Sequence, residues 1–207
     1  MAERTAACTA CHGTQGKAGP DGYYPRLAGK PAGYLYNQLR NFQEGRRHYT
    51  LMAGLLAPLG PDYLRDMASY FSELDVPYPA PARSSASPAV LERGKTLVLQ
   101  GDTALGVPAC VACHGSALTG VQPSTPGLLG LPRDYLNAQL GGWQTGQRKA
   151  HAPDCMAAIA RKLSADDVNA ASQWLSSQPL PSHTKPALQR PSAVAGALKL
   201  PPCGSAP

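Results

Sequence analysis

Two pentapeptides organise this chain: residues 8–12 read CTACH and residues 110–114 read CVACH. Both follow the pattern Cys-x-x-Cys-His, which attaches a c-type haem. The two thiols of each copy bond to the vinyl groups of one haem, and the adjacent histidine becomes the proximal ligand of its iron. We therefore expect two covalent haem c groups, held by Cys8, Cys11 and His12 and by Cys110, Cys113 and His114.

Other uses of the same residues fit the pattern less well. Zinc takes Cys-x-x-Cys half-sites, but paired half-sites usually lie within about 20 residues of each other. Here the two copies begin 102 positions apart. A thioredoxin-like pair would need alternating strands and helices around it, and neither copy has them. A disulfide inside each motif is the remaining alternative.

Composition excludes several classes of protein. The chain has 207 residues, a formal net charge of +6 and 43% hydrophobic residues. It has no basic run with interleaved aromatic residues, so nucleic acid is not an expected partner. No stretch reaches the roughly 18 apolar residues of a transmembrane helix. The first residues lack a signal sequence, yet such haems are attached outside the cytoplasm. We expect a periplasmic protein whose signal was removed or truncated, or whose gene start was misplaced.

The two halves repeat each other beyond the haem motifs. Residues 25–31 read PRLAGKP, and residues 126–132 read PGLLGLP. Further pairs follow at a constant offset of 101, among them Gln38 with Gln139 and Arg47 with Arg148. Self-similarity of this kind indicates a duplicated domain.

Apolar spacing predicts a helix after Pro31 and another after Pro132. It also predicts a final helix in each half. The first of these begins near Pro61, and the second begins at the capping box of Ser164 and Asp167. We expect an all-α fold of two tandem haem domains. The predicted parts are a first domain at 1–74 with a short N-terminus, a Pro-rich linker at 75–88, a second domain at 89–178 and a Pro-rich tail without regular structure at 179–207.

Two methionines occupy equivalent places in the repeat. Met52 follows His12 by 40 residues, and Met156 follows His114 by 42. Met67 lies on the core face of a predicted helix, where packing explains it. We expect Met52 and Met156 to be the second axial ligands, which would close both irons and favour electron transfer over catalysis.

The chain resembles the cytochrome c4 family of two-haem cytochromes over about residues 6–178, through the CxxCH motifs, the Pro-x-Leu-x-Gly-x-Pro segments, the Tyr-Leu-x-x-Gln-Leu helices and the two methionines. The resemblance implies tandem cytochrome c domains and backbone carbonyls of Pro25 and Pro126 that bind the proximal imidazoles. It also implies a periplasmic carrier whose redox partners are a membrane respiratory complex and a terminal oxidase.

Two cysteines lie outside the motifs, and in an oxidising compartment Cys155 and Cys203 are expected to pair. An alternative is that Cys155 replaces Met156 on the iron, which would resemble thiosulfate dehydrogenases. The basic residues Arg46, Arg47 and His48 match Arg148, Lys149 and His151. They could bind haem propionates, form a docking patch or remain a solvated loop.

Three functions remain open from the sequence. The first is a diffusible electron carrier. The second is a cytochrome subunit held by a dehydrogenase complex, with the tail as its tether. The third is a haem enzyme such as a thiosulfate dehydrogenase or a peroxidase, which would need an open or labile iron.

Overall fold

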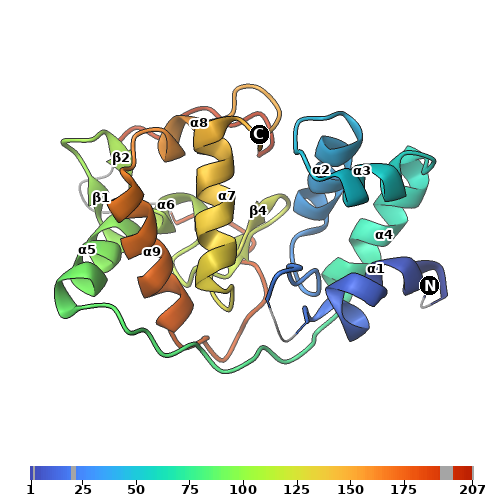
Figure 1. Ribbon diagram of the computed structural model, residues 1–207, viewed down its shortest axis with the longest axis horizontal. Coiled ribbons are helices and arrows are strands. Elements are labelled where there is room, and N and C mark those ends of the chain that lie inside the picture. Colours follow the sequence, from blue (N-terminus) through green and yellow to red (C-terminus); the bar gives the residue numbers. More distant parts are fainter. Residues whose placement is uncertain (2, 20–21, 192–197, 207) are drawn as a thin grey trace.

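The computed structural model describes residues 1, 3–19, 22–191 and 198–206. It shows two helical halves side by side, the first on the right of Figure 1 and the second on the left. In chain order, the first half contains η1 Glu3–Thr5, α1 Ala6–His12, η2 Thr14–Gly16, α2 Ala32–Gln43, α3 Thr50–Leu56 and α4 Pro61–Glu73.

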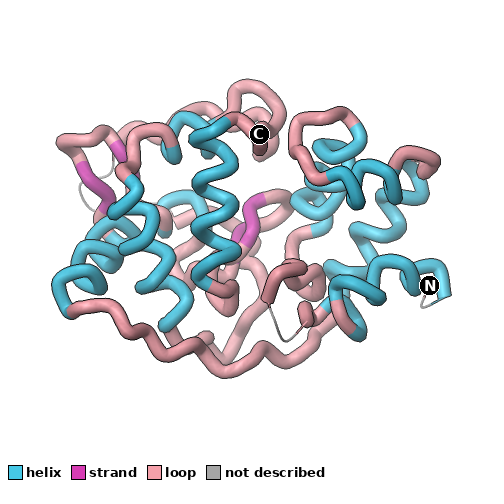
Figure 2. Tube along the Cα trace, viewed as in Figure 1, coloured by secondary structure: helices cyan, strands magenta, loops and turns pink. Residues whose placement is uncertain are grey.

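The second half repeats the helices of the first, with helix α5 and short strands added (Figure 2). Its helices are α5 Pro88–Leu99, α6 Val111–His114, α7 Arg133–Thr145, α8 Cys155–Ala160 and α9 Ala165–Ser177. Antiparallel ladders join β1 Gly101–Asp102 to β2 Val107–Pro108 and β3 Gly120–Val121 to β4 Thr125–Pro126. The predicted helical fold is confirmed. The ladders are additional, and strands of two residues are too short to leave an alternating pattern in the sequence.

Local sequence explains where the helices begin. Pro31 and Pro132 are the N-cap residues of α2 and α7, and Pro61 is the first residue of α4. Proline suits such positions because its missing N–H has no partner at the start of a helix. At α9 the predicted capping box is present: Ser164 Oγ accepts from the Asp167 amide at 3.0 Å, and Asp167 accepts from the Ser164 amide at 3.1 Å.

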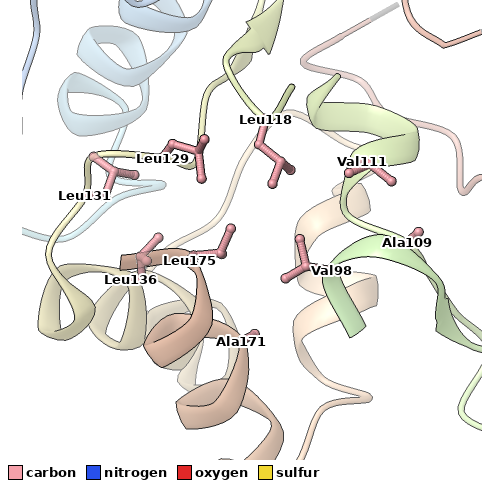
Figure 3. Close-up of a cluster of buried hydrophobic side chains, with 9 residues drawn as sticks. All are labelled: Val98, Ala109, Val111, Leu118, Leu129, Leu131, Leu136, Ala171 and Leu175. Carbon is pink, nitrogen blue, oxygen red and sulfur yellow. The ribbon is translucent and has the colours of Figure 1, made fainter. Parts of the chain in front are cut away.

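Each half packs its helices around an apolar interior. On α4 the predicted core residues Leu64, Met67, Ala68 and Phe71 are all buried. In the second half α5 packs against α9. They approach closely at Gly94, where an added Cβ would lie 2.1 Å from the carbonyl oxygen of Ala170. Figure 3 shows side chains from α5, α6, α7, α9 and the intervening loops facing one another: Val98, Ala109, Val111, Leu118, Leu129, Leu131, Leu136, Ala171 and Leu175.

The segment between α4 and α5 runs extended along the lower edge of Figure 1 and is fastened to both halves. The buried Arg26 of the first half donates to the carbonyl oxygens of Val76 and Pro77, the latter at 3.1 Å. Its guanidinium lies 3.7 Å from the ring centroid of Tyr78. On the other side, the Ala82 amide donates to a carbonyl at the end of α9. These contacts hold the segment in place between the halves.

Candidate functional site

The first Cys-x-x-Cys-His motif lies on α1, and the residue after it turns the chain sharply. Gly13 has φ of +74°, and an added Cβ would lie 2.5 Å from the carbonyl oxygen of Ala18. Only glycine fits such a turn without strain. Gly115 has a similar φ of +86° after the second motif on α6. The four motif cysteines form no disulfide bond.

Both motif histidines are oriented by backbone carbonyls. His12 donates from Nδ1 to the Pro25 carbonyl at 2.7 Å, and His114 donates to the Pro126 carbonyl at the same distance. These are the hydrogen bonds that the resemblance implied. Burial lowers the pKa of each imidazole, and the proline carbonyl opposes that shift. A neutral ring that donates from Nδ1 leaves Nε2 available to bind a metal.

A cavity of about 750 Å³ opens into the first half, and the first motif and Met52 share its wall. Met52 lies on α3, which the sequence analysis did not predict as a helix. Met67 also lines the cavity from α4 and is only 4% exposed. The structure therefore brings Cys8, Cys11, His12 and Met52 around one apolar space, as the sequence analysis expected.

The second methionine lies on the corresponding short helix, α8. Met156 packs against Leu140, Trp143, Ala157 and Ala160. The helix begins at Asp154, whose side chain accepts from the Ala157 amide at 3.0 Å and from the Ala150 amide at 2.7 Å. This N-cap holds the start of the segment that carries Met156.

In each half, one glutamine binds carbonyl oxygens at the C-terminal end of the helix that carries the methionine. Gln43 donates to the carbonyl oxygens of Leu56 and Leu59 at 2.6 and 2.9 Å. Gln144 donates to those of Ala160 and Leu163 at 2.9 and 2.8 Å. The sequence analysis missed both residues. The signal was present, because they obey the 101-residue offset of the repeat.

The two halves meet through a self-complementary network. The His48 amide donates to the Gln147 carbonyl at 2.9 Å, and the Lys149 amide donates to the Arg46 carbonyl at 2.6 Å. Side chains cross in the same reciprocal way. Arg47 donates to Gln139 at 2.7 Å and to Tyr135 at 3.5 Å, whereas Arg148 donates to Gln38 at 3.1 Å and to Tyr34 at 3.4 Å. A reciprocal pattern is the property of an interface with two-fold symmetry.

This network corrects one interpretation of the basic clusters. Arg148 is 6% exposed, and Arg47 is partly buried. Neither belongs to a solvated loop, because each reaches across to the other half. Arg46 forms an ion pair with Glu44 and a 2.7 Å hydrogen bond to Asn41 in its own half, and its guanidinium also lies 3.1 Å from Nε2 of His151 in the second half.

Buried cations near the interface provide a test of whether the residues fit haem. Within the part of the chain that the structure describes, no ion pair joins Lys30, Arg47 or Arg148 to a carboxylate. Burial lowers the pKa of Lys30 and of Arg148. The buried Trp143 Nε1 also has no hydrogen-bond partner. Buried cations are normally paired with anions, and a buried N–H donor needs a hydrogen-bond acceptor. Haem propionates would supply them, so the residues fit the cofactor.

The remaining cysteines join the tail to α8. A disulfide links Cys155 to Cys203, with Cα atoms 4.8 Å apart. The Cys155 thiol is therefore not free to replace Met156. The disulfide also fastens the tail to its own chain, which argues against the tail as a tether to another subunit. In the described residues no three side chains of His, Cys, Asp or Glu gather as a metal site, and no helix is long and apolar enough to cross a bilayer.

Comparison with known proteins agrees with this site. The cytochrome c family matches residues 4–74. The "Thiosulfate dehydrogenase electron acceptor" of Thiomonas intermedia is 39% identical over 88% of this chain and 82% of its own length. Its counterpart from Stutzerimonas stutzeri is 38% identical over 81% and 77%. Cytochrome c4 of Pseudomonas aeruginosa is 33% identical over 83% and 84%.

Solved structures show the same fold. A thiosulfate dehydrogenase from Marichromatium purpuratum matches with a TM-score of 0.76 and 32% identity over 86% of this chain, which spans 39% of that longer one. Reduced cytochrome c4 from Pseudomonas stutzeri matches with a TM-score of 0.72 and 31% identity, over 85% of this chain and 95% of that one. The repeated motifs, the matched hydrogen bonds of His12 and His114 and these relatives agree, and the chain belongs to the cytochrome c family as a protein with two covalent haem c groups.

Proposed function

We propose that this electron carrier accepts electrons from a thiosulfate dehydrogenase. The similarity to two thiosulfate dehydrogenase electron acceptors, at 39% and 38% identity, is the observation that carries the proposal. It favours the idea of a cytochrome that serves a dehydrogenase over that of a carrier between respiratory complexes. When bound, each haem exchanges a single electron at its iron. The compartment that suits this role is the periplasm.

The chain's own residues would hold both irons closed. We assign His12 with Met52, and His114 with Met156, as the axial ligand pairs. The shared cavity of the first pair supports this assignment, as do the matched hydrogen bonds of the two histidines. A thioether is a soft ligand that stabilises ferrous iron and raises the reduction potential. A closed iron also explains why the protein needs a separate enzyme for substrate chemistry.

A second candidate is transfer to a terminal oxidase, which the similarity to cytochrome c4 at 33% identity favours. The two roles are compatible, because a carrier needs both a donor and an acceptor. The cytochrome would then be reduced by the dehydrogenase and oxidised downstream.

The test combines thiosulfate, a purified thiosulfate dehydrogenase from Thiomonas intermedia and the two-haem protein. We expect rapid appearance of ferrous haem absorbance only when all three are present. Reduction of both haems by thiosulfate alone, at enzymatic rates, would instead make the protein an enzyme. Absence of reduction in the complete mixture would reject the proposed donor.

The ligand assignment has its own test. Met52→Ala should remove the methionine–iron absorption of one haem and leave the other intact, and Met156→Ala should do the reverse. The matched control is Met67→Ala, which should lower stability by about 2–5 kcal/mol as a buried methionine but keep both absorption bands. A Met52→Ala protein with an unchanged spectrum would contradict the assignment.

A further inference from the structure

Lys30 is a buried cation without a counterpart in the repeat. It immediately precedes Pro31, the N-cap residue of α2, and is 6% exposed. At the offset of 101 the matching residue of the second half is Leu131, which is also 6% exposed. The two halves therefore bury residues of different charge at the same place in the repeat.

The surroundings of Lys30 do not balance its charge. Within the part of the chain that the structure describes, no ion pair joins it to a carboxylate. Burial lowers the pKa of Lys30; Tyr34 opposes this shift, whereas the cations Arg26 and Arg148 add to it. A cation removed from water in this way needs an anion that the polypeptide does not supply.

The cavity that Lys30 lines is shared by the two halves. His12 lines it from the first half, and Tyr135, Gln139 and Arg148 line it from the second. Haem propionates within this space would supply the missing anion. Lys30 therefore belongs to the surroundings of the cofactor, at the place where the halves meet.

The start of α2 is packed against the loop that orients the second histidine. The Gly33 amide donates to the Pro123 carbonyl at 3.0 Å, and a Cβ added at Gly33 would lie 2.7 Å from that oxygen. Helix α2 also contacts β4, whose Pro126 carbonyl accepts from His114 at 2.7 Å. The first half thus brings its buried lysine toward the histidine side of the second haem site.

The cations that act on the two histidines differ accordingly. Burial lowers the pKa of both imidazoles. The charges of Lys30 and Arg190 lower that of His114 further, whereas Arg47 has this effect at His12. The charge of Lys30 therefore acts across the interface, on the histidine of the other half.

The reciprocal contact carries no such charge. Pro132, at the start of α7, approaches the first half at Gly22, where an added Cβ would lie 2.5 Å from the proline side chain. The preceding residue is Leu131, whose side chain belongs to the apolar core of the second half (Figure 3). An interface that is reciprocal in its arginines, glutamines and tyrosines is unequal at this position.

We propose that Lys30 of the first half acts on the second haem, where its charge stabilises the ferrous state. Reduction removes one positive charge from the iron, so a buried cation nearby raises the reduction potential. In the transfer that this favours, the iron held by His12 loses one electron and becomes ferric. The iron held by His114 gains that electron and becomes ferrous. The inference uses the two haem groups and is independent of which protein donates the electron.

The experiment removes the charge from the holoprotein. Lys30→Leu gives the first half the residue that the second half has at this place. Both reduction potentials are followed in one redox titration by NMR, with the shifted signals of His12 and His114 assigned through their sequence neighbours. We expect the potential of the second haem to fall. The electron equilibrium between the halves should move about tenfold toward the first, which corresponds to about 59 mV for a one-electron couple.

Three further variants separate charge from packing. Lys30→Arg keeps the charge and should keep the wild-type potentials. Lys30→Gln is a second neutral variant, used if the leucine variant does not fold, and it should lower the second potential in the same way. The matched control is Lys95→Leu, which removes a lysine of the second half whose side chain is 49% exposed. Water and salt screen that charge, so both potentials should stay near the wild-type values.

The outcomes are distinct from those of the proposed function. An unchanged second potential in a folded neutral variant overturns the inference, as does a fall that is as large or larger at the first haem. Equal falls in Lys95→Leu, or in Lys30→Arg, would assign the effect to net charge or to packing and would also overturn it. None of these results bears on reduction by a thiosulfate dehydrogenase, which the mixing experiment decides separately.

Discussion

Replacement of Gln144 by alanine should loosen the helix that carries Met156 while leaving the first half unchanged. Gln144 reaches from α7 to the carbonyl oxygens of Ala160 and Leu163, at 2.9 and 2.8 Å. These carbonyls end α8 and the turn after it. The Ala160 carbonyl is the last of the helix and has no partner within it; it also accepts from the Leu163 amide of the turn at 3.2 Å.

The magnitude follows from the number of bonds. A hydrogen bond contributes about 1 kcal/mol net to stability, so the loss of two costs about 2 kcal/mol. Exogenous imidazole can replace the thioether only when the segment around Met156 moves away. Because 1.4 kcal/mol is a factor of ten in an equilibrium constant, the affinity of imidazole for the second iron should rise roughly 30-fold.

The assay is a spectroscopic titration of the oxidised holoprotein with imidazole, which resolves loss of the methionine–iron bond. Gln43→Ala is the matched control, since its two bonds to α3 and the turn after it are equivalent. It should sensitise only the first iron. Equal imidazole affinities in the wild-type and Gln144→Ala proteins, with the variant folded, would refute the argument that this side chain holds α8.

Three further predictions concern stability and the interface. Removal of the Cys155–Cys203 disulfide, which spans 48 residues, should lower the free energy of unfolding by about 4 kcal/mol in the chain-entropy model. Denaturant unfolding measures this change. An unchanged denaturation midpoint would show that the unfolded chain without the disulfide is equally constrained. Arg148→Ala should speed hydrogen exchange of the His48 and Lys149 amides, which bond across the halves. Exchange at the wild-type rate would mean that the Arg148 guanidinium does not hold these amides in place. Arg93 donates to Asp102 at 2.8 Å, and this bond, aided by the Leu105 amide, lowers the pKa of the carboxyl. The stability lost in Arg93→Ala should therefore be complete above about pH 4 and fade as the pH falls through the lowered pKa, and a loss that grows in acid would contradict that sign.

Much of the haem-binding apparatus could be predicted from sequence because its chemistry is local. The spacing of Cys8, Cys11 and His12 lies within one helical turn, and covalent attachment demands it. The core face of α4 and the capping box at Ser164 are likewise short-range patterns, and both are present as predicted. The short helix α3 was missed because seven residues carry too little periodicity to identify it.

Residues far apart in the chain were harder to interpret. Gln43 and Gln144 repeat at the same offset as the core residues, but their partners follow them by 13 to 19 positions. A side chain that caps a distant helix leaves no signature at its own position. The repeat showed that such pairs are matched, without showing what they contact.

The sequence by itself determined the covalent cofactor sites, the duplication and the helical framework, because each depends on residues within a few turns of one another. Only the tertiary structure decided that Arg47 and Arg148 cross between the halves, at separations of 92 and 110 residues from their glutamine partners. It also decided that the described part of the tail is fastened to the second half through the Cys155–Cys203 disulfide. Both depend on surfaces that meet only after each half has folded, and the packing of complete halves selects such contacts.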